Sequence, residues 1–521
     1  MAETIIGKNV LESLTRSMYA DSRCVYREYI QNAADQIDAA KEIHPELEYS
    51  VFVKINSDSR NVVIEDDATG VRADDVKALL VDVARSLKIR GVNKGFRGIG
   101  RLGGLAYCKT LKFETSYFDE DIISTVKWDA VHLNQILDDD DDDRDAGSVI
   151  DAIVTIDTKQ DEDIRSKHYF KVIMEDVTDD KLLNEKNIRD YLAMVAPVDY
   201  SNHFIYRRDI YKFMQEHNLH LDCYNIFVGD DQLSKDYTMS IFDQSGQIDD
   251  TVTGIKFWYE ENTNGQPMYW GWYSISSLKG ILNKTNKARN LRLRCENIQL
   301  GDETTCYRFM PSGDKARFVR YFFGEIHVLP TSKLVPDSHR DYLRVDEGLK
   351  EFENNVEANF LELEKLCYGA SDARKADRTI KQSDTREGQI RTRLNKGVTS
   401  PTQQQKLSDE LSELRQKREK AKQKLRQIHQ NWQSNGNPLI DMFSPMGIQL
   451  PQPEQPHQLP VNSLQQPSAT IKLRTDDKKY GKFQQKEKEL ILAIYNVIEQ
   501  TLNNEKERDA LIDKIEHEIT K

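Results

Sequence analysis

The chain has 521 residues, of which 31% are charged, and its formal net charge at neutral pH is −13. A chain of this length is too long for one ordinary hydrophobic core, so we expect about two to four domains. The acidic balance argues against a bulk nucleic-acid binder, which normally carries a basic field, although a local basic patch stays compatible with it.

Neither the cysteines nor the apolar segments indicate a secreted or membrane protein. The six cysteines are scattered without paired metal-ligand spacing, which favours reduced thiols in a cytosolic protein. No cationic start followed by an apolar run marks a signal peptide, and no stretch is long enough to span a bilayer. We therefore expect a cytoplasmic protein with no membrane partner.

Residues 22–42 predict a helix with a polar stripe. Glu28, Asn32 and Asp35 stand at positions i, i+4 and i+7, so they share one face, and apolar residues flank them. Such a stripe is usually a solvated helix face. Burying an acid, an amide and a second acid without ligands or partners would be costly, so its meaning depends on the segments that follow.

Two neighbouring strands are expected next, at residues 49–55 and 61–65, because both segments are β-branched or alternate in polarity. The second strand runs directly into Asp66 and a turn of small residues that ends at Gly70. A carboxylate at the end of a strand can point into a pocket, and a glycine lets the backbone approach a bound planar group closely.

A basic, glycine-rich loop at residues 88–104 follows a predicted helix at 73–86 and leads into a helix of small residues. Free N–H groups at a helix start suit phosphate oxygens. The loop lacks the Gly-Lys-Ser/Thr of a Walker A motif, and no alternating strand precedes it as in a dinucleotide fingerprint. Taken alone, it is weak evidence for a phosphate site, and a flexible hinge that packs tightly against a helix is the favoured alternative.

In this fixed order, the three motifs resemble the GHKL ATPase superfamily, which includes DNA gyrase B, the ninety-kilodalton heat-shock chaperones, histidine kinases and MutL. The likeness is greatest to the heat-shock chaperone branch and its bacterial relatives, whose opening helices are similar to residues 17–35 almost throughout. The motif match spans residues 10–110. The resemblance implies a Bergerat-type two-layer α/β sandwich that binds ATP and Mg²⁺.

The resemblance also implies roles for matching residues. Glu28 would be the general base that polarises the attacking water, and Asn32 would hold Mg²⁺ between the phosphates. Asp66 would accept the adenine amino group, and Gly70 would allow the ring close approach. Asp35 would orient water or hold the helix rather than act in catalysis.

The phosphates would be held by the glycine-rich loop. The resemblance implies that Arg97, Gly98, Ile99 and Gly100 present backbone N–H groups to them, within a mobile lid at residues 87–101. One departure is Ala68, which stands where many relatives carry glycine.

The rest of the first domain, residues 1–197, is expected to complete the sheet, with strands at 110–116, 123–128, 149–156 and 170–175. The aspartate run at 138–143 predicts a solvated surface loop, since like charges repel; a weak cation site is the less favoured alternative. Relatives carry a Gly-Thr pair where this chain has Tyr169 and Phe170, so no nucleotide contact is expected from that pair.

Residues 198–346 are rich in strand patterns and predict a second α/β domain of the middle, or transducer, type. Its three tryptophans, Trp258, Trp270 and Trp272, are expected to pack in the core. Predicted strands stand at 224–228, 237–242, 252–260, 268–276, 291–294 and 320–329.

The end of the middle domain carries a candidate catalytic arginine. Residues 324–343 look like the strand and loop by which heat-shock chaperones deliver an arginine to the γ-phosphate, which would be Arg340 here. A permanently charged guanidinium suits charge spread over phosphate oxygens. The alternative is a surface arginine paired with Asp337 or Asp341, and Lys279 and Arg289 are weaker candidates for the same role.

The C-terminal part predicts helices separated by a linker, which makes the whole chain an α+β protein. Residues 347–433 are charged with sparse apolar positions, as in a helical hairpin or coiled coil interrupted near 397–401. Residues 434–475 are rich in Pro, Gln and Ser and are expected to lack a fixed fold. Amphipathic helices at 476–521 must bury an apolar stripe, which favours a homodimer.

The function implied is an ATP-binding and slowly ATP-hydrolysing, Mg-dependent conformational clamp resembling the heat-shock chaperones. Its partner is expected to be a protein client or effector, with bacterial stress and anti-phage defence as candidate settings. The alternative is an ATP-gated DNA clamp or sensor like MutL or the MORC proteins. Nucleic acid is not the favoured partner because the chain is acidic, and a histidine kinase is unfavoured because no phosphoacceptor helix is evident.

Overall fold

The computed structural model describes residues 5–15, 19, 21–83, 100–164, 167–397, 400–434, 443–444, 446–450, 480–501 and 505–520. Contacts between residues divide the chain into two compact units, Met1–Pro451 and Gln452–Lys521. Among the described residues, the first unit holds sheets of eight, five and two strands and a long helical hairpin, and the second holds two helices, so the expected α+β class is confirmed.

The first sheet has eight strands in the order β5-β4-β3-β6-β2-β1-β7-β8. All neighbours are antiparallel except β1 and β7, which pair in parallel. Side chains along β2 alternate between partly exposed and buried, as expected for a sheet with one face in the core. The strands are β1 Ser50–Asn56, β2 Asn61–Asp66, β3 Thr110–Ser116, β4 Ile122–Asp129, β5 Val154–Gln160, β6 Tyr169–Glu175, β7 Asn225–Val228 and β8 Asp231–Gln232.

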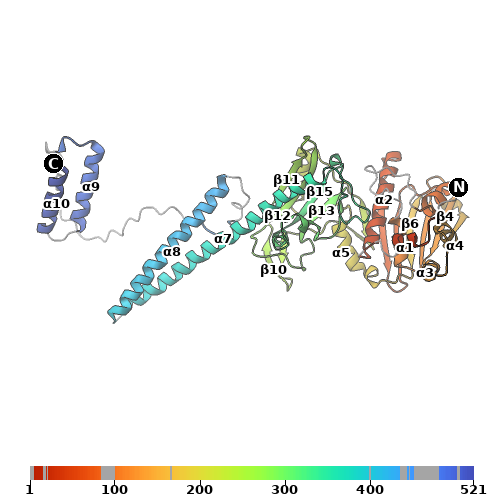
Figure 1. Cartoon of the computed structure of the whole chain (residues 1–521), viewed down its shortest axis with the longest axis horizontal. Coiled ribbons are helices and arrows are strands. Elements are labelled where there is room, and N and C mark those ends of the chain that lie inside the picture. The colour runs from red at the N-terminus through yellow and green to blue at the C-terminus, as the bar shows by residue number, and fades with distance from the viewer. Residues whose placement is uncertain are drawn as a thin grey trace. The chain divides into compact units, whose positions relative to one another are not determined.

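Helix α2 (Cys24–Ile43) packs against β1 and β2 and forms the centre of the helical layer (Figure 1). Its apolar residues Val25, Ile30, Ala33 and Ile37 are at most 3% exposed. The other helices of this region are α1 Asn9–Thr15, η1 Ala73–Asp75, η2 Lys77–Val81, η3 Gly100–Ala106, α3 Ala130–Asp138, α4 Ala146–Ile153, η4 Glu162–Ile164, η5 Asp180–Leu182, α5 Glu185–Val195 and α6 Arg207–Glu216.

Two predicted elements differ from the structure. The helix predicted at 73–86 is a 3₁₀ turn, η1, followed by a π-helical turn, η2, and it ends because Asp82 is extended, with ψ at 116°. The first half of the strand predicted at 149–156 is helix α4. The Asp145 side chain caps this helix by accepting a 2.7 Å hydrogen bond from the Ser148 N–H, and so starts a helix within an apolar run.

The second sheet has five strands in the order β11-β12-β15-β13-β14. Trp258, Trp270 and Trp272 are at most 6% exposed, which confirms the expectation that they pack in the core. The strands of the region are β9 Ser240–Phe242, β10 Ile248–Thr251, β11 Gly254–Glu261, β12 Pro267–Ile275, β13 Asn290–Cys295, β14 Ile298–Gln299 and β15 Phe323–Val328, with 3₁₀ turns η6 Thr305–Phe309, η7 Lys315–Tyr321 and η8 Pro330–Ser332.

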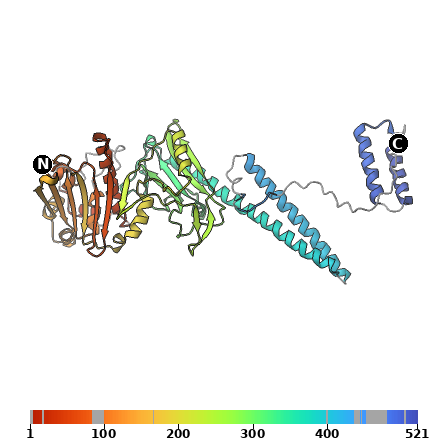
Figure 2. The same ribbon diagram turned by 180° about the vertical axis from the view of Figure 1, so that it is seen from behind.

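Helix α7 (Leu349–Asn395) is a single helix of 47 residues, and α8 (Pro401–Ser434) returns alongside it (Figures 1 and 2). The first half of α7 buries Phe352, Val356 and Phe360 in the core of the five-stranded sheet. The predicted hairpin and its interruption are therefore confirmed. Of the linker predicted at 434–475, the structure describes residues 434, 443–444 and 446–450, and the rest lies outside the described residues. The prediction that the segment lacks a fixed fold is wrong for its described part, because Phe443 and Ile448 are buried in the same core.

The second unit contains α9 (Gln485–Thr501) and α10 (Glu505–Thr520). Tyr480, Ile491 and Tyr495 form its small core. Among the described residues of the whole chain, no helix is both long and apolar enough to cross a membrane.

Candidate nucleotide site

Helix α2 carries the predicted polar stripe, and the short helix η3 packs directly on it. The Tyr29 hydroxyl accepts a 3.0 Å hydrogen bond from the Gly104 N–H and donates one of 3.1 Å to the Arg101 carbonyl. A side chain at Gly104 would place its Cβ 2.4 Å from that hydroxyl. Glycine therefore permits the close approach of the two helices, which is the packing role that the loop motif left open.

The contact between η3 and α2 brings Gly100 next to Glu28. A Cβ at Gly100 would lie 2.7 Å from Glu28 Oε2, so the end of the predicted lid touches the predicted general base. The Glu28 side chain is 13% exposed, and its Oε1 lies 3.5 Å from the Arg27 guanidinium. This oxygen is buried and accepts no hydrogen bond from the described residues. A carboxylate oxygen in that state is suited to a water or ligand proton.

The Asp66 turn is fixed by the neighbouring strands. Asp66 ends β2 with 3% of its surface exposed, and its carboxylate accepts a 3.2 Å hydrogen bond from the Ala68 N–H. Gly70 has a φ of +71°, and a Cβ there would lie 2.1 Å from the Ser116 carbonyl oxygen. Glycine is therefore required here, because its lack of a side chain lets the turn pack directly against the backbone of β3.

A row of side chains beside Asp66 was not found by sequence reasoning. Asp66 is the direct cross-strand partner of Phe170, which in turn pairs with Thr115, and Thr115 pairs with Ser124. Direct partners lie on the same face of a sheet, and Asp66, Thr115 and Ser124 are all buried. The row crosses four strands and so needs their order, which no local pattern supplies.

Phe170 and Thr115 change the chemistry expected beside Asp66. Phe170 occupies the position where relatives were expected to carry threonine, and it lies 6.0 Å from the Phe113 ring. Thr115 supplies the hydroxyl from the next strand: it donates a 2.9 Å hydrogen bond to the Tyr169 carbonyl and accepts one of 2.9 Å from the Val71 N–H. The wall beside Asp66 is therefore aromatic, which suits a planar base.

The loop that carries Arg340 lies against α2. The Arg27 guanidinium, next to Glu28 in the chain, donates a 2.9 Å hydrogen bond to the carbonyl of His339, next to Arg340. This hydrogen bond joins distant parts of the chain. The two predicted catalytic residues stand directly after its two partners, Glu28 after Arg27 and Arg340 after His339. Arg27 is 2% exposed and Arg340 is 6% exposed, whereas His339 is exposed, so the contact is partly buried.

The Arg340 loop has a defined conformation, and Arg340 is buried rather than at the surface as in the alternative prediction. The Asp337 carboxylate accepts 3.1 Å hydrogen bonds from the N–H groups of His339 and Asp341, which tightens the turn. Arg340 has a φ of +57°, and its carbonyl accepts a 2.8 Å hydrogen bond from the Gly301 N–H. A non-glycine residue in this left-handed conformation is held there by its surroundings.

The two weaker candidates for the catalytic cation lie elsewhere. The Lys279 side chain is 51% exposed and lies 3.5 Å from Asp249. The Arg289 guanidinium pairs with Glu303 at 2.7 Å. Among the described residues, neither side chain makes a hydrogen bond or ion pair with α2, whereas the Arg340 loop does, so the geometry favours Arg340.

A buried charged cluster lies behind the Arg340 loop in the five-stranded sheet. The Glu325 carboxylate contacts Lys235 at 2.8 Å, His327 at 3.0 Å and Arg294 at 2.5 Å, and it accepts a hydrogen bond of 3.0 Å from Tyr237. Although burial disfavours its charge, the Arg294 and Lys235 cations hold the pKa of Glu325 well below its usual range. Burial lowers the pKa of His327 to about 4, so this imidazole is neutral.

The charged cluster also reaches the first domain. The Arg294 guanidinium donates to the carbonyl of Met194 near the end of α5, and Asn297 donates 3.3 Å and 2.6 Å hydrogen bonds to the carbonyls of Val198 and Asp222. The five-stranded sheet is therefore hydrogen-bonded directly to the chain that leaves the first domain.

The remaining predicted site residues fall into two groups. Asn32 is partly exposed and Asp35 is 4% exposed, both on α2. Arg97, Gly98 and Ile99 lie outside the described residues, as does most of the predicted lid.

Asn32 fits a role as a single protein ligand of Mg²⁺, which usually takes one or two oxygen ligands from the protein and the rest from phosphates and water. Within the part of the chain that the structure describes, no group of three or more His, Cys, Asp or Glu residues is arranged to hold a metal by itself. The described residues are therefore compatible with a Mg²⁺ ion that is held mainly by the phosphates of a bound nucleotide. The roles of all these residues stay predictions.

The comparison with known families agrees with this geometry. Residues 21–140 match the family model described as histidine kinase-, DNA gyrase B-, and HSP90-like ATPase. The match contains α2, the Asp66 turn and η3, which are the elements that the site is built from. No curated protein sequence matches the chain.

Proposed function

We propose that the protein is a Mg-dependent conformational clamp that binds and slowly hydrolyses ATP, because residues 21–140 match a family model of GHKL-type ATPases. In this proposal it resembles the heat-shock chaperone branch, in which a loop of the middle domain completes the site. The observation that carries the proposal is the partly buried hydrogen bond from Arg27 to the His339 carbonyl.

The residues of α2 and β2 would divide the work on the nucleotide. Asp66 accepts the adenine amino group, with Phe170 beside it as an aromatic wall, and Gly70 lets the ring approach. Glu28 accepts a proton from the water that attacks the γ-phosphate, since one of its oxygens has no hydrogen bond from the described residues. Mg²⁺ held at Asn32 would neutralise phosphate charge when bound.

Arg340 would complete the site from the middle domain. Its guanidinium would stabilise the charge that develops on the transferring phosphoryl group, as an arginine finger does. The contact of its loop with Arg27, the residue before Glu28, supports this role. Hydrolysis would then remove the γ-phosphate that the arginine binds, which releases the loop.

Three substitutions test these assignments separately. Glu28→Ala should abolish turnover but keep ATP binding, Asp66→Asn should abolish binding, and Arg340→Ala should keep binding but lower turnover by about a thousandfold or more. Arg344→Ala is the matched control, because Arg344 lies in the same loop and pairs with Asp346 at 3.5 Å. Wild-type turnover in Glu28→Ala, or wild-type affinity in Asp66→Asn, would refute the corresponding role.

We propose further that the protein is a homodimer through its C-terminal helices. Leu490, Ile494 and Val497 follow one face of α9 and are 63%, 41% and 61% exposed. Burial of these exposed apolar side chains is favourable, and a second copy supplies an apolar surface of the same kind. Leu490→Glu with Val497→Glu should halve the mass measured by light scattering; Lys488→Glu with Lys506→Glu, outside the stripe, should not. An unchanged mass in the first variant would contradict this dimer.

The partner of the clamp would be a protein client or effector in the cytoplasm, with bacterial stress or anti-phage defence as its setting. Capture from cells of the source organism with ATP-competent protein, compared with Asp66→Asn, tests this. Proteins that depend on ATP binding for their capture support a client; identical sets from both forms would count against one.

A further inference from the structure

The helical hairpin carries the opposite charge from the rest of the chain. Residues 371–434 contain 16 lysine and arginine residues and 8 aspartate and glutamate residues, although the whole chain has a net charge of −13. A basic region in an acidic protein is an electrostatic signal, because the remaining surface repels the polyanions that this region attracts.

Much of the acidic charge of the hairpin is used between its own helices. Glu387 is 6% exposed and contacts Arg391, Arg415 and Arg418 at 2.6 to 3.3 Å. Glu410 of α8 accepts two hydrogen bonds from Arg386 of α7. The pairs with Arg415, Arg418 and Arg386 join α7 to α8, whereas the Glu387–Arg391 pair lies within α7. Because the basic residues of the hairpin outnumber its acidic residues by 16 to 8, cations remain on the surface that faces away from the contact.

The excess cations follow one face of α7, which we call the basic stripe. It contains Arg374, Lys375, Arg378, Lys381, Arg393 and Lys396. These positions repeat at helical spacing and lie opposite the face that α7 buries against α8, which includes Ala376, Ser383 and Ile390. All six are exposed except Arg374, which is half-buried.

Uncharged hydrogen-bond donors stand between the cations. Gln382, Thr385 and Gln389 lie on the same face of α7 and are exposed. Asp377 is the acidic residue beside them, and its carboxylate pairs with Lys381 at 2.8 Å. The stripe therefore presents cations, amides and a hydroxyl, which are the side chains that contact phosphate and sugar oxygens in nucleic acids.

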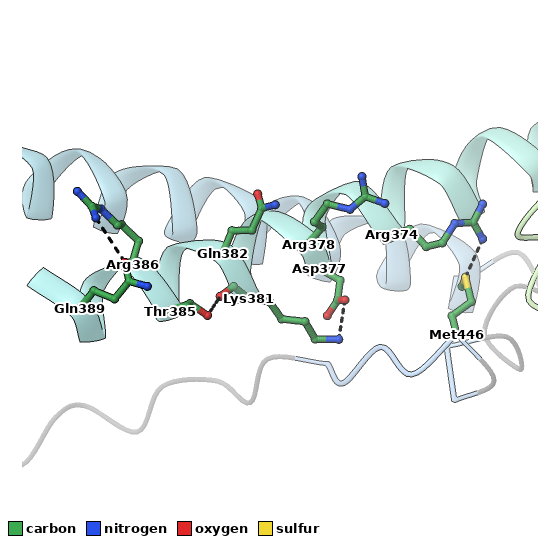
Figure 3. A pocket seen from close by; sticks show the side chains of 9 residues that line it. All are labelled: Arg374, Asp377, Arg378, Lys381, Gln382, Thr385, Arg386, Gln389 and Met446. Atoms are coloured by element: carbon green, nitrogen blue, oxygen red, sulfur yellow. Dashed lines mark hydrogen bonds and ion pairs between the residues drawn. The ribbon is translucent and has the colours of Figure 1, made fainter.

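Part of the stripe lines a groove of about 610 Å³ beside the segment that follows α8 (Figure 3). At one end, Arg374 donates hydrogen bonds of 2.5 Å and 2.9 Å to the carbonyls of Ser277 and Leu278 and lies 3.6 Å from Met446 Sδ. Arg374 is thus fixed in place, while Arg378 and Lys381 extend the groove along the helix (Figure 3). The groove is open to solvent, and all of its lining residues except Met446 carry a charged or polar group, unlike an enclosed pocket for a small molecule.

We propose that the basic stripe binds the phosphate backbone of a nucleic-acid duplex without reading its bases. From Arg374 to Lys396 the stripe is about 33 Å long at 1.5 Å per residue, which is close to one turn of duplex. Residues 371–396 contain no aromatic side chain, so the stripe lacks the stacking surface that favours a single strand. The stripe lies outside the nucleotide site, so this binding does not rest on the proposed ATPase function.

The test is fluorescence anisotropy of the full chain with a labelled 30-base-pair duplex, a single strand of equal length, and vesicles of anionic lipid. The triple variant Arg378→Glu, Arg393→Glu and Lys396→Glu reverses three exposed stripe cations. Its control reverses three exposed lysines elsewhere, Lys127→Glu, Lys212→Glu and Lys350→Glu, with the same change in net charge. Equal melting temperatures would show that both variants are folded.

Duplex affinity should fall by about a hundredfold or more in the stripe variant at moderate salt and stay within about threefold in the control. The slope of log affinity against log salt should become shallower by about 3, since each lost phosphate contact removes about 0.9. Asp66→Asn should bind the duplex as tightly as wild type. Equal losses in both triple variants, tighter binding to the single strand or the vesicles, or no binding at all would overturn the proposal.

Discussion

Replacing Arg27 with leucine should slow ATP turnover without weakening ATP binding. The Arg27 side chain is 2% exposed, and it joins α2 to the Arg340 loop through the 2.9 Å hydrogen bond to the His339 carbonyl. It also lies 3.5 Å from Glu28 Oε1. Leucine keeps part of the packing volume and removes both polar contacts, so the variant loses the tie between the loop and the helix.

The expected size follows from the chemistry of that bond. A hydrogen bond from a charged donor stabilises a buried arrangement by about 1.5–3 kcal/mol. If the closed arrangement is needed for hydrolysis, its loss lowers the turnover rate by about 10- to 150-fold. Asp66 and Gly70 are not in contact with Arg27 in any described interaction, so affinity for ATP should change little.

The measurement is the turnover rate at saturating ATP together with a titration of a fluorescent ATP analogue. Arg23→Leu is the matched control, since Arg23 precedes the same helix but pairs with Asp21 at 2.6 Å. Wild-type turnover in folded Arg27→Leu would refute the idea that this contact positions Arg340. A loss of affinity equal to the loss of rate would place Arg27 in nucleotide binding instead.

Three further outcomes are expected. Gly70→Ala should abolish ATP binding, because its Cβ would lie 2.1 Å from the Ser116 carbonyl oxygen. The control Gly246→Ala has a φ of +83° and open space around it, so it should lower the free energy of unfolding in a urea titration by only about 1–2 kcal/mol. Glu325→Gln should cost about 3–5 kcal/mol in the same titration, since it leaves buried cations without their carboxylate. The free energy of unfolding should fall as the pH drops from 6.5 toward 4, because the pKa of His327 is about 4 in the folded protein and 6.5 in the unfolded chain, which therefore binds the proton first. The expected loss is up to about 3 kcal/mol. His327→Gln should remove this part of the pH dependence.

Local patterns predicted the elements that alternate cleanly or carry their own caps. The strands β1, β2 and β3 were expected within one residue of their bounds, because their apolar residues alternate along a half-buried sheet. Residues 149–156 misled the same reasoning. Their apolar run fits either a strand or a helix, and the cap from Asp145 decides for the helix at its start.

Long-range pairing was beyond the reach of any local pattern. Strand β7 joins the first sheet by pairing in parallel with β1, although it lies past the predicted domain boundary at 197, which stays a prediction. The row from Asp66 to Ser124 likewise depends on the strand order. Nothing near Arg27 in the sequence indicates that it contacts His339, whereas Glu28 and Arg340 were found because a family resemblance carries information about distant contacts.

Helix α7 is shared by the five-stranded sheet region and the helical hairpin, and it connects them without a break. Its first turns are embedded in the core of the five-stranded sheet, and the same uninterrupted helix continues as one strut of the hairpin. A rotation of that sheet by about 10° would swing the far end of the helix, about 33 Å beyond Arg374, through about 6 Å. A small rotation of the five-stranded sheet, such as one caused by movement of the Arg340 loop, would therefore produce a larger displacement of the basic stripe.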